Sequence, residues 1–281
     1  MRKNFPLILT LLGGAAGFGL RKWQLTAGFE PDTRLPIPGA PSAMLLIALS
    51  ILVAVGVFLL IWSGKGSAPV DVAFSAARDN SLFLTAIVLS GFLLLLSTGF
   101  ELLSFSAVYG ANVGEDANQV SRVASMVLPP LRILFCVAGL PCAVLWARKL
   151  YRGKEAREQL PLLELCLLFC LWLITDYQVR ASDPIIMDYV FEVFAIALSL
   201  LGLYYIAGWS FQAGKPRRTI FFCLMGSFFS LVTLADAHSY ADLCRFGFSI
   251  LFLSAHAALL LHRPPYTEDE TGASDAETEA E

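Results

Sequence analysis

Long apolar stretches alternate with short polar or Gly- and Pro-rich links along almost the whole chain. An α-helix needs about 20 consecutive apolar residues to cross a bilayer, whose hydrocarbon core is roughly 30 Å thick. The links have the composition of loops that leave the bilayer, where backbone groups can bind water. We therefore predict an all-α fold, a polytopic membrane helix bundle of eight transmembrane helices. The predicted spans are residues 5–20, 42–63, 82–109, 123–147, 161–179, 184–211, 219–235 and 241–261.

The composition agrees with a membrane protein and leaves little room for a soluble domain. Of the 281 residues, 57% are hydrophobic and 15% are charged, whereas a soluble domain carries about 25% charged residues. We assign residues 1–263 to the bundle. Residues 264–281 hold seven acids and no base, which predicts a disordered acidic tail. The six cysteines lie in apolar segments, where a free thiol behaves as a small hydrophobic group.

The first and seventh segments give the weakest signals. The first has 16 apolar residues, which make a helix of about 24 Å, somewhat short for a bilayer. It has two interpretations. It is either a cleaved signal peptide or a helix that continues past Leu20, with Arg21 and Lys22 reaching for the interface and Trp23 anchored there. We favour the helix, since positive charge directly after a cleavage site opposes export. Its small residues would form a face for close packing: Gly13, Gly14, Gly17 and Gly19.

The basic residues predict the orientation of the chain. With the N-terminus in the cytoplasm and eight alternating spans, thirteen Lys and Arg residues fall on the inner side and six on the outer side. The bias agrees with the positive-inside rule. The links "ARKLYRGKEAR" and "GKPRR" carry most of it. Both termini, including the acidic tail, are therefore predicted to be cytoplasmic.

Three charged residues stand out deep inside the predicted spans, and each costs about 2.5 to 3.5 kcal/mol on insertion scales. From the helical rise, Arg132 lies about 14 Å below the outer end of its segment, and Glu101 and Glu192 lie about 12 Å below theirs. We expect no other basic residue at this depth. An arginine fork can bind two carboxylates, so we expect Arg132 to pair with Glu101, Glu192 or both. Asp188 shares a helix face with Glu192. The cluster is either a buried staple that fixes helix register or a site for a ligand or ion.

Two prolines precede Arg132 in the same segment. Pro129 and Pro130 each lack a backbone donor, so the carbonyls of Ser125 and Met126 lose their helical partners. Broken helices beside intramembrane charges are typical of transporters, where freed carbonyls bind substrate. The alternative is an ordinary proline kink, which is common in membrane helices.

Further charged residues collect on the predicted outer side, and four are candidates for the rim of a vestibule: Asp176, Arg180, Asp236 and Arg245. The plainer interpretation, which we favour, is that they keep the outer loops in water. The sequence contains no catalytic signature, and neither a cofactor nor a metal site is predicted. Cys166 and Cys170 lie one turn apart but lack a second ligand pair, which favours core packing. For His256, a hydrogen-bonded core histidine is favoured over a proton relay.

Three strings along the chain suggest a family. "GLRKWQL" with "TRLPIPGAP" near the start, "DP" followed by "DYVFE", and "YYIAGWSF" followed by "KPRR" together resemble a group of uncharacterised multi-pass membrane proteins of anaerobic Gram-positive bacteria. The likeness covers most of the chain. The resemblance implies that the protein lies in a bacterial inner membrane, and it implies no particular activity.

Two functions remain open from the sequence. The first is a transporter or channel-like carrier of a small polar or anionic solute, with Arg132 as the binding cation. The alternative is a non-catalytic membrane component that acts as a sensor, an assembly partner or a regulator. An intramembrane enzyme is disfavoured because catalytic motifs are missing from the sequence. The expected partners are the lipid bilayer, a small solute in the first case and further protein subunits in an oligomer, with no role for nucleic acid.

Overall fold

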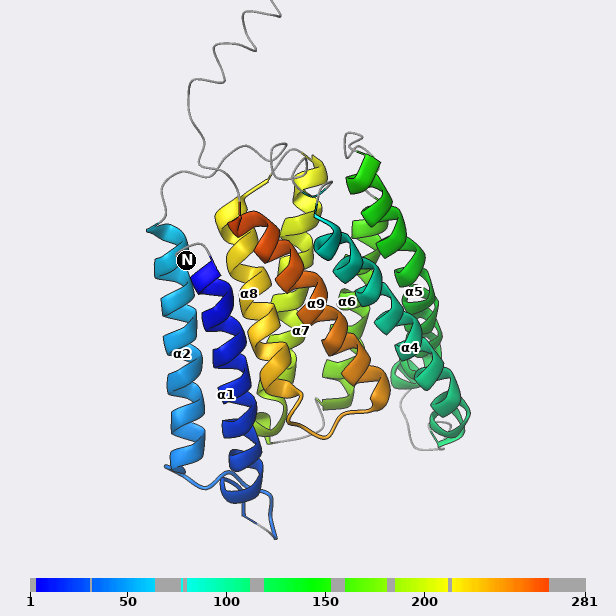
Figure 1. Cartoon of the computed structure of the whole chain (residues 1–281). Coiled ribbons are helices and arrows are strands. Elements are labelled where there is room, and N and C mark those ends of the chain that lie inside the picture. Colours follow the sequence, from blue (N-terminus) through cyan, green and yellow to red (C-terminus); the bar gives the residue numbers. More distant parts are fainter. Residues whose placement is uncertain are drawn as a thin grey trace, which may run out of the picture.

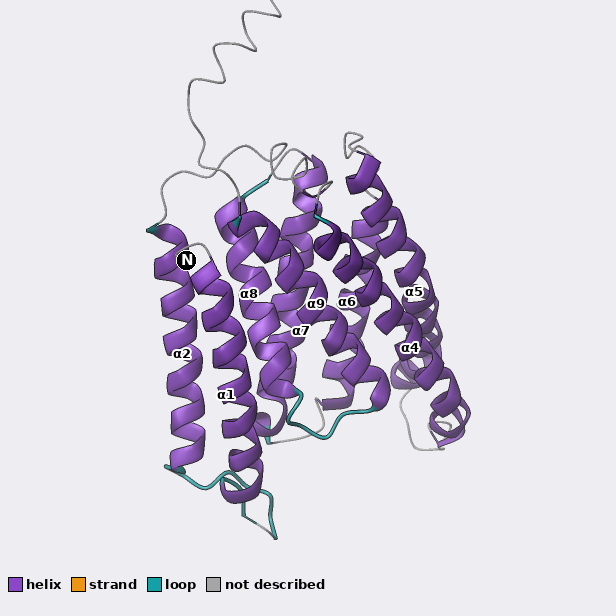
Figure 2. Ribbon diagram, in the orientation of Figure 1, coloured by secondary structure: helices purple, strands orange, loops and turns teal. Residues whose placement is uncertain are grey.

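The computed structural model describes residues 4–30, 32–63, 77, 80–111, 119–152, 160–180, 185–211 and 214–262. They form an all-α structure, as predicted, and one long helix lies over each of the eight apolar segments (Figures 1 and 2). The helices are α1 (Phe5–Ala27), α2 (Pro41–Trp62), α4 (Ser81–Ala111), α5 (Gln119–Arg152), α6 (Leu160–Arg180), α7 (Ile186–Ala207), α8 (Pro216–Thr233) and α9 (Tyr240–Leu261). A short 3-10 helix, η2 (Gly208–Phe211), follows α7.

Several helix starts follow directly from local chemistry. Pro41 and Pro216 begin α2 and α8, because proline lacks the donor that the first helical residue would leave unused. Ser239 caps α9, with its Oγ accepting a hydrogen bond of 3.1 Å from the Asp242 amide. The starts of these helices are therefore set by their own sequence.

Successive helices run in opposite directions, so α1 begins and α9 ends at the same end of the bundle (Figure 1). We call this the terminal end. We call the opposite end, where the loop 28–40 joins α1 to α2, the hairpin end. The helices α4, α5, α6, α7, α8 and α9 form a closed ring in which each contacts the next, and α9 also contacts α4. The pair α1 and α2 packs on the outside of this ring, mainly against α8.

Aromatic side chains fill the space between α6 and α9 across the ring. Trp172 packs on Phe246 with 4.8 Å between ring centroids, and Phe169 packs on Phe248 at 5.7 Å. All four side chains are buried. Rings at these separations add to the free energy of burial. The described interior at this level is therefore packed with side chains.

Six helices are long and apolar enough to cross a membrane: α2, α4, α5, α6, α7 and α9. The two that fall short, α1 and α8, contain the first and seventh segments, which gave the weakest sequence signals. The helix α8 falls short because Pro216, Arg217 and Arg218 lie within its 18 residues. Twelve of these residues are buried against neighbouring helices. A helix surrounded by protein can carry Ser227, Ser230 and Thr233 without exposing them to lipid.

The helix α1 extends to Ala27, so it continues past Leu20, the end of the apolar segment, as the favoured interpretation expects. Gly13, Gly14 and Gly17 form the expected close contact. A methyl group on Gly14 would lie 2.6 Å from Leu231 of α8, and one on Gly17 would lie 2.6 Å from Val232. The inclusion of Gly19 in this face is wrong, because no described atom lies within 4 Å of where its methyl group would be.

The helix α5 is continuous across Pro129, Pro130 and Pro141. The broken helix that the two adjacent prolines suggested is therefore not seen, and Arg132 projects from a regular helix. The predicted acidic tail, residues 264–281, lies outside the described residues.

Candidate functional site: a layer of buried ion pairs

Charged side chains from six helices and one loop meet at the hairpin end. We call this group the polar layer. It consists of Arg21 of α1, Glu101 of α4, Arg132 of α5, Asp176 and Arg180 of α6, Asp188 and Glu192 of α7, Asp236 and His238 of the α8–α9 loop, and Asp242 and Arg245 of α9. The layer contains three ion-pair groups, each joining different helices.

Arg21 anchors the first group. Its side chain is 0% exposed, and its Nε donates to Asp236 Oδ1 at 2.7 Å. Its Nη1 donates to Gln24 Oε1 at 2.9 Å, and its Nη2 donates to the Asp188 carbonyl at 2.6 Å. The guanidinium also lies 5.0 Å from the centroid of the Phe191 ring. A buried cation is stable only when its donors are occupied in this way. The expectation that Arg21 reaches for the interface is therefore wrong.

Arg132 and Glu101 form the core of the second group. Arg132 Nε donates to Glu101 Oε1 at 2.7 Å, Nη2 donates to the same oxygen, and Nη1 donates to Thr175 Oγ1 of α6 at 3.0 Å. The side chain of Arg132 is 19% exposed. Pairing of Arg132 with Glu101 is thus confirmed. Glu192, the other predicted partner, binds elsewhere.

Arg245 extends the second group on the opposite side of Glu101. Its side chain is 1% exposed, with Nη1 at 3.5 Å from Glu101 Oε2 and Nη2 donating to Asp242 Oδ1 at 2.8 Å. It lies 5.0 Å from the Trp172 ring centroid. Glu101 therefore lies between two arginines. The expectation that Arg132 is the only basic residue at this depth is wrong.

Glu192 forms the third group with Arg180 and His238. Arg180 Nη2 donates to Glu192 Oε2 at 2.8 Å, and His238 Nδ1 lies 3.3 Å from Glu192 Oε1. His238 Nε2 lies 2.7 Å from the Thr233 carbonyl, so both ring nitrogens face acceptors, as a protonated ring requires. Burial opposes the charged ring, but the hydrogen bond and negative charge of Glu192 prevail and raise the pKa of His238 above 6.5.

Four buried polar atoms of the layer have no hydrogen-bond partner among the described residues. They are Glu101 Oε2, Asp176 Oδ2, and Nε and Nη1 of Arg245. Asp176 and Arg245 interact electrostatically, which places these acceptors and donors in the same part of the layer. Asp188 is half-buried and contributes its carbonyl to Arg21, and its negative charge acts on Arg180.

The four rim candidates lie within this layer, and the interpretation that they keep loops in water is wrong for Asp236 and Arg245. Both are drawn into the bundle by partners on other helices. The burial of Arg21 was not predicted from the sequence. A signal was present, because Thr10, Gly13 and Gly17 continue at helical spacing to Arg21 and form one buried face. That face ends at Arg21 and Gln24, beyond the apolar segment of residues 5–20.

The remaining candidates have ordinary packing roles. His256 accepts a hydrogen bond from Trp146 Nε1 at 3.2 Å, and its Nδ1 lies 2.8 Å from the Phe252 carbonyl, so it is a hydrogen-bonded core residue. Cys166 and Cys170 are free thiols. Within the ranges that the structure describes, no group of three or more His, Cys, Asp or Glu residues could hold a metal ion.

No family model matches the chain, and neither a curated protein nor a solved structure shows detectable similarity to it. The polar layer is therefore interpreted from its own chemistry. Its ion pairs join α1 to the α8–α9 loop, α4 to α5 and α9, and α6 to α7. A layer of this kind can hold helices in register, because an ion pair formed in a low-dielectric interior is lost if either helix slides.

Proposed function

We propose that the chain is a multi-pass protein of a bacterial cytoplasmic membrane with eight spans and both termini inside the cell. The alternating directions of the eight helices support this topology (Figure 1). So does the charge distribution, since the described basic residues of the terminal end are concentrated where α5 ends and α8 begins: Arg148, Lys149, Arg152, Lys215, Arg217 and Arg218. Under the positive-inside rule this end faces the cytoplasm.

Reporter fusions test the topology. Fusions after Gly153 and Lys215 should read as cytoplasmic, and fusions within residues 33–40 should read as external. The latter segment is the loop at the hairpin end, so the two sets sample opposite sides of the bundle. An external reading for the link after α5 would overturn the topology.

We infer that the protein acts as a non-catalytic membrane component, a sensor, an assembly partner or a regulator, with a closed helix bundle. The observation that carries this inference is the pairing of Arg132. Its guanidinium is held by Glu101 and Thr175, so the cation is already neutralised by the protein. Among the described residues, two pockets lie at the terminal end of the bundle, and Arg132 lines neither of them.

Purified protein in detergent and in proteoliposomes tests this role. We expect that chloride, phosphate, acetate and glutamate produce no saturable rise in the melting temperature. We also expect no flux of these anions above that of protein-free vesicles. Flux of one anion, lost on substitution of a polar-layer residue that leaves the melting temperature unchanged, would overturn the proposal.

A carrier of a small polar solute is the second candidate, and one observation favours it. Arg245 Nε and Asp176 Oδ2 have no described hydrogen-bond partner, so they offer one donor and one acceptor to a small polar guest. Asp176→Asn tests this candidate, because the substitution breaks no described hydrogen bond of Asp176 Oδ2. If a solute binds there, the substitution should weaken its binding at least tenfold with little change in the melting temperature of the free protein. Unchanged binding would exclude this position.

A further inference from the structure

A basic pocket lies at the terminal end of the bundle, on the side opposite the polar layer. It has a volume of about 500 Å³ and lies between the end of α2, at Trp62, and the start of α8. Lys215, Arg217 and Arg218 supply its charge, and its lining contains no acidic residue. The first turn of α8 adds the positive end of a helix dipole. The pocket therefore has the chemistry to bind an anion.

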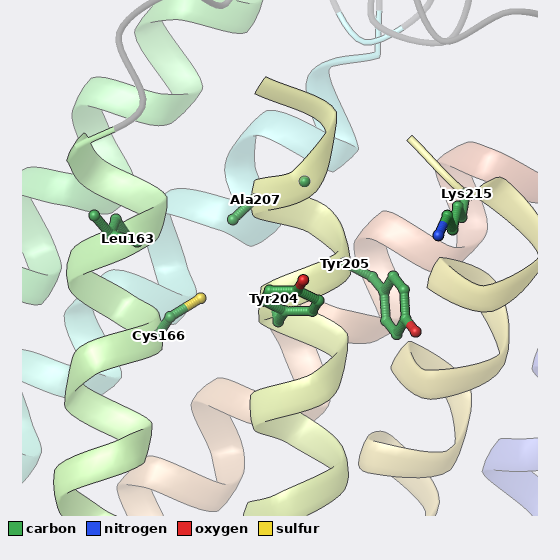
Figure 3. Close-up of a pocket in the computed structure, with 7 residues that line it drawn as sticks. Leu163, Cys166, Tyr204, Tyr205, Ala207 and Lys215 are labelled. Atoms are coloured by element: carbon green, nitrogen blue, oxygen red, sulfur yellow. The ribbon is translucent and has the colours of Figure 1, made fainter. Parts of the chain in front are cut away.

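An apolar pocket adjoins the basic one, and Lys215 lines both. It has a volume of about 240 Å³, and most of its surface comes from α6 and α7. Cys166 of α6 points toward α7, where Tyr204 and Ala207 lie, and Tyr205 and Lys215 lie on the α8 side of α7 (Figure 3). Tyr204 is 60% exposed, so this pocket is on the outer surface of the bundle. In a bilayer this surface would face lipid.

The two pockets together match the two parts of a phospholipid. Lysine and arginine bind phosphate, arginine through a planar fork and lysine as a point charge. Tyrosine and tryptophan concentrate at the membrane interface, where their polar atoms reach the headgroups. Leu163 and Cys166 offer the apolar contact that an acyl chain requires. A free anion would use the basic pocket and leave the apolar pocket without a role.

We propose that one anionic phospholipid binds here, with its phosphate against Lys215, Arg217 and Arg218 and one acyl chain along the surface between α6 and α7. The assignment of this lipid to the cytoplasmic leaflet rests on the proposed topology, whereas its binding does not. Basic pockets between membrane helices on the cytoplasmic side are a recurring means of binding anionic headgroups.

Native mass spectrometry of the full chain in detergent tests the proposal, with phosphatidylglycerol and phosphatidylcholine as probes. We expect one phosphatidylglycerol to bind each chain saturably and at least tenfold more tightly than phosphatidylcholine. The double variant Arg217→Gln/Arg218→Gln should lose this preference. The matched control Arg148→Gln/Arg152→Gln removes the same charge from the same end of the bundle, outside both pockets, and should keep it.

Two single-site variants test the two pockets separately, and the one in the apolar pocket distinguishes a bound phospholipid from a bound free anion. Lys215→Gln changes one exposed side chain and should weaken phosphatidylglycerol binding, which tests the site even if the double variant fails to fold. Leu163→Trp should weaken it without a change in charge, because it fills the apolar pocket. Equal binding of both lipids, or equal loss in the control variant, would overturn the proposal. Displacement of the lipid by millimolar inorganic phosphate with no effect of Leu163→Trp would instead assign a free-anion site. Because micelles impose no orientation, these outcomes are independent of the reporter fusions.

Discussion

Buried charge in the polar layer is tolerable because most of its charged side chains have a partner on another element. Glu101 shows the arrangement most clearly, since Arg132 holds one of its oxygens and Arg245 lies 3.5 Å from the other. Removing one member of a buried pair leaves an uncompensated charge, which typically costs about 3 to 5 kcal/mol. The identity of each partner therefore determines which substitutions depend on one another.

A double-mutant cycle should identify the partner of Arg132. We expect the effects of Arg132→Ala and Glu101→Gln on stability to be coupled by about 0.5 to 3 kcal/mol, because the two side chains are hydrogen-bonded to each other. The measurement is thermal unfolding in detergent. Arg132→Ala with Glu192→Gln is the matched control and should be additive within about 0.5 kcal/mol, since Glu192 binds Arg180 and His238. Strong coupling to Glu192 would contradict the observed pairing.

The stability of the third ion-pair group should depend on pH. His238 has a raised pKa in the folded protein, so below its ordinary value of 6.5 both the folded and the unfolded chain are protonated and the stabilisation is complete. As the pH rises above 6.5, the unfolded chain loses its proton first, and the melting temperature should fall until the folded His238 also deprotonates.

Variants of two histidines separate this effect from general pH sensitivity. His238→Gln should remove the fall in melting temperature between pH 6.5 and the raised pKa. His262→Gln, a change at an exposed position at the terminal end, should retain it. A melting temperature that rises with pH across this window in the wild-type protein would contradict the assignment of His238.

At the scale of the element, α8 joins the α1–α2 pair to the ring of six helices. It contacts α1, α2, α7 and α9, and its glycine at position 226 allows the closest approach. A methyl group there would lie 3.0 Å from the Ser199 amide nitrogen and 3.1 Å from its Cα. These are backbone atoms of α7, which cannot move aside as the end of a side chain can.

Gly226→Ala should therefore separate α8 from α7. We expect a destabilisation of about 1 to 3 kcal/mol, the usual cost of overpacking, measured as the change in melting temperature in detergent. Gly19→Ala is the control, because no described atom lies near its added methyl group. Equal melting temperatures for the two variants would show that α7 and α8 can separate without cost.

At the scale of the whole molecule, the α1–α2 pair joins the six-helix ring through one lateral surface. Glycines of α1 pack on α8, and Arg21 forms a polar contact that reaches both Asp236 and the first turn of α7. The pair has few other contacts with the ring. Its attachment should therefore be sensitive to a single charged side chain.

Arg21→Ala should loosen the pair from the ring, because Asp236 then remains buried without its cation. We expect a loss of about 3 to 5 kcal/mol in the free energy of unfolding, measured by thermal unfolding of the full chain in detergent. Lys22→Ala alters the exposed neighbour and should change stability by less than about 0.5 kcal/mol. Similar stabilities for the two variants would mean that Arg21 contributes no more than a surface charge.

The amino-acid sequence by itself determined the number and placement of the long helices and the pairing of Arg132 with a carboxylate at its own depth, but it left open whether that carboxylate is Glu101 or Glu192. These follow from local physics, because a membrane helix must be a long apolar run and a cation in such a run requires a carboxylate at the same depth. The burial of α8 among four neighbouring helices was not visible in the sequence, since hydropathy does not distinguish a face in contact with protein from one in contact with lipid.

Tertiary structure alone decided which residues at the helix ends are buried in the bundle. Asp236 and Arg245 are close to the loops in sequence, yet both are buried by partners from other helices. Arg21 is buried because α1 continues beyond its apolar run, so that the face begun by Gly13 and Gly17 also carries this side chain against α7 and the α8–α9 loop. Position along one helix gives depth, whereas the choice of partner depends on the rotation of each helix about its axis, which only the packing of the whole bundle fixes.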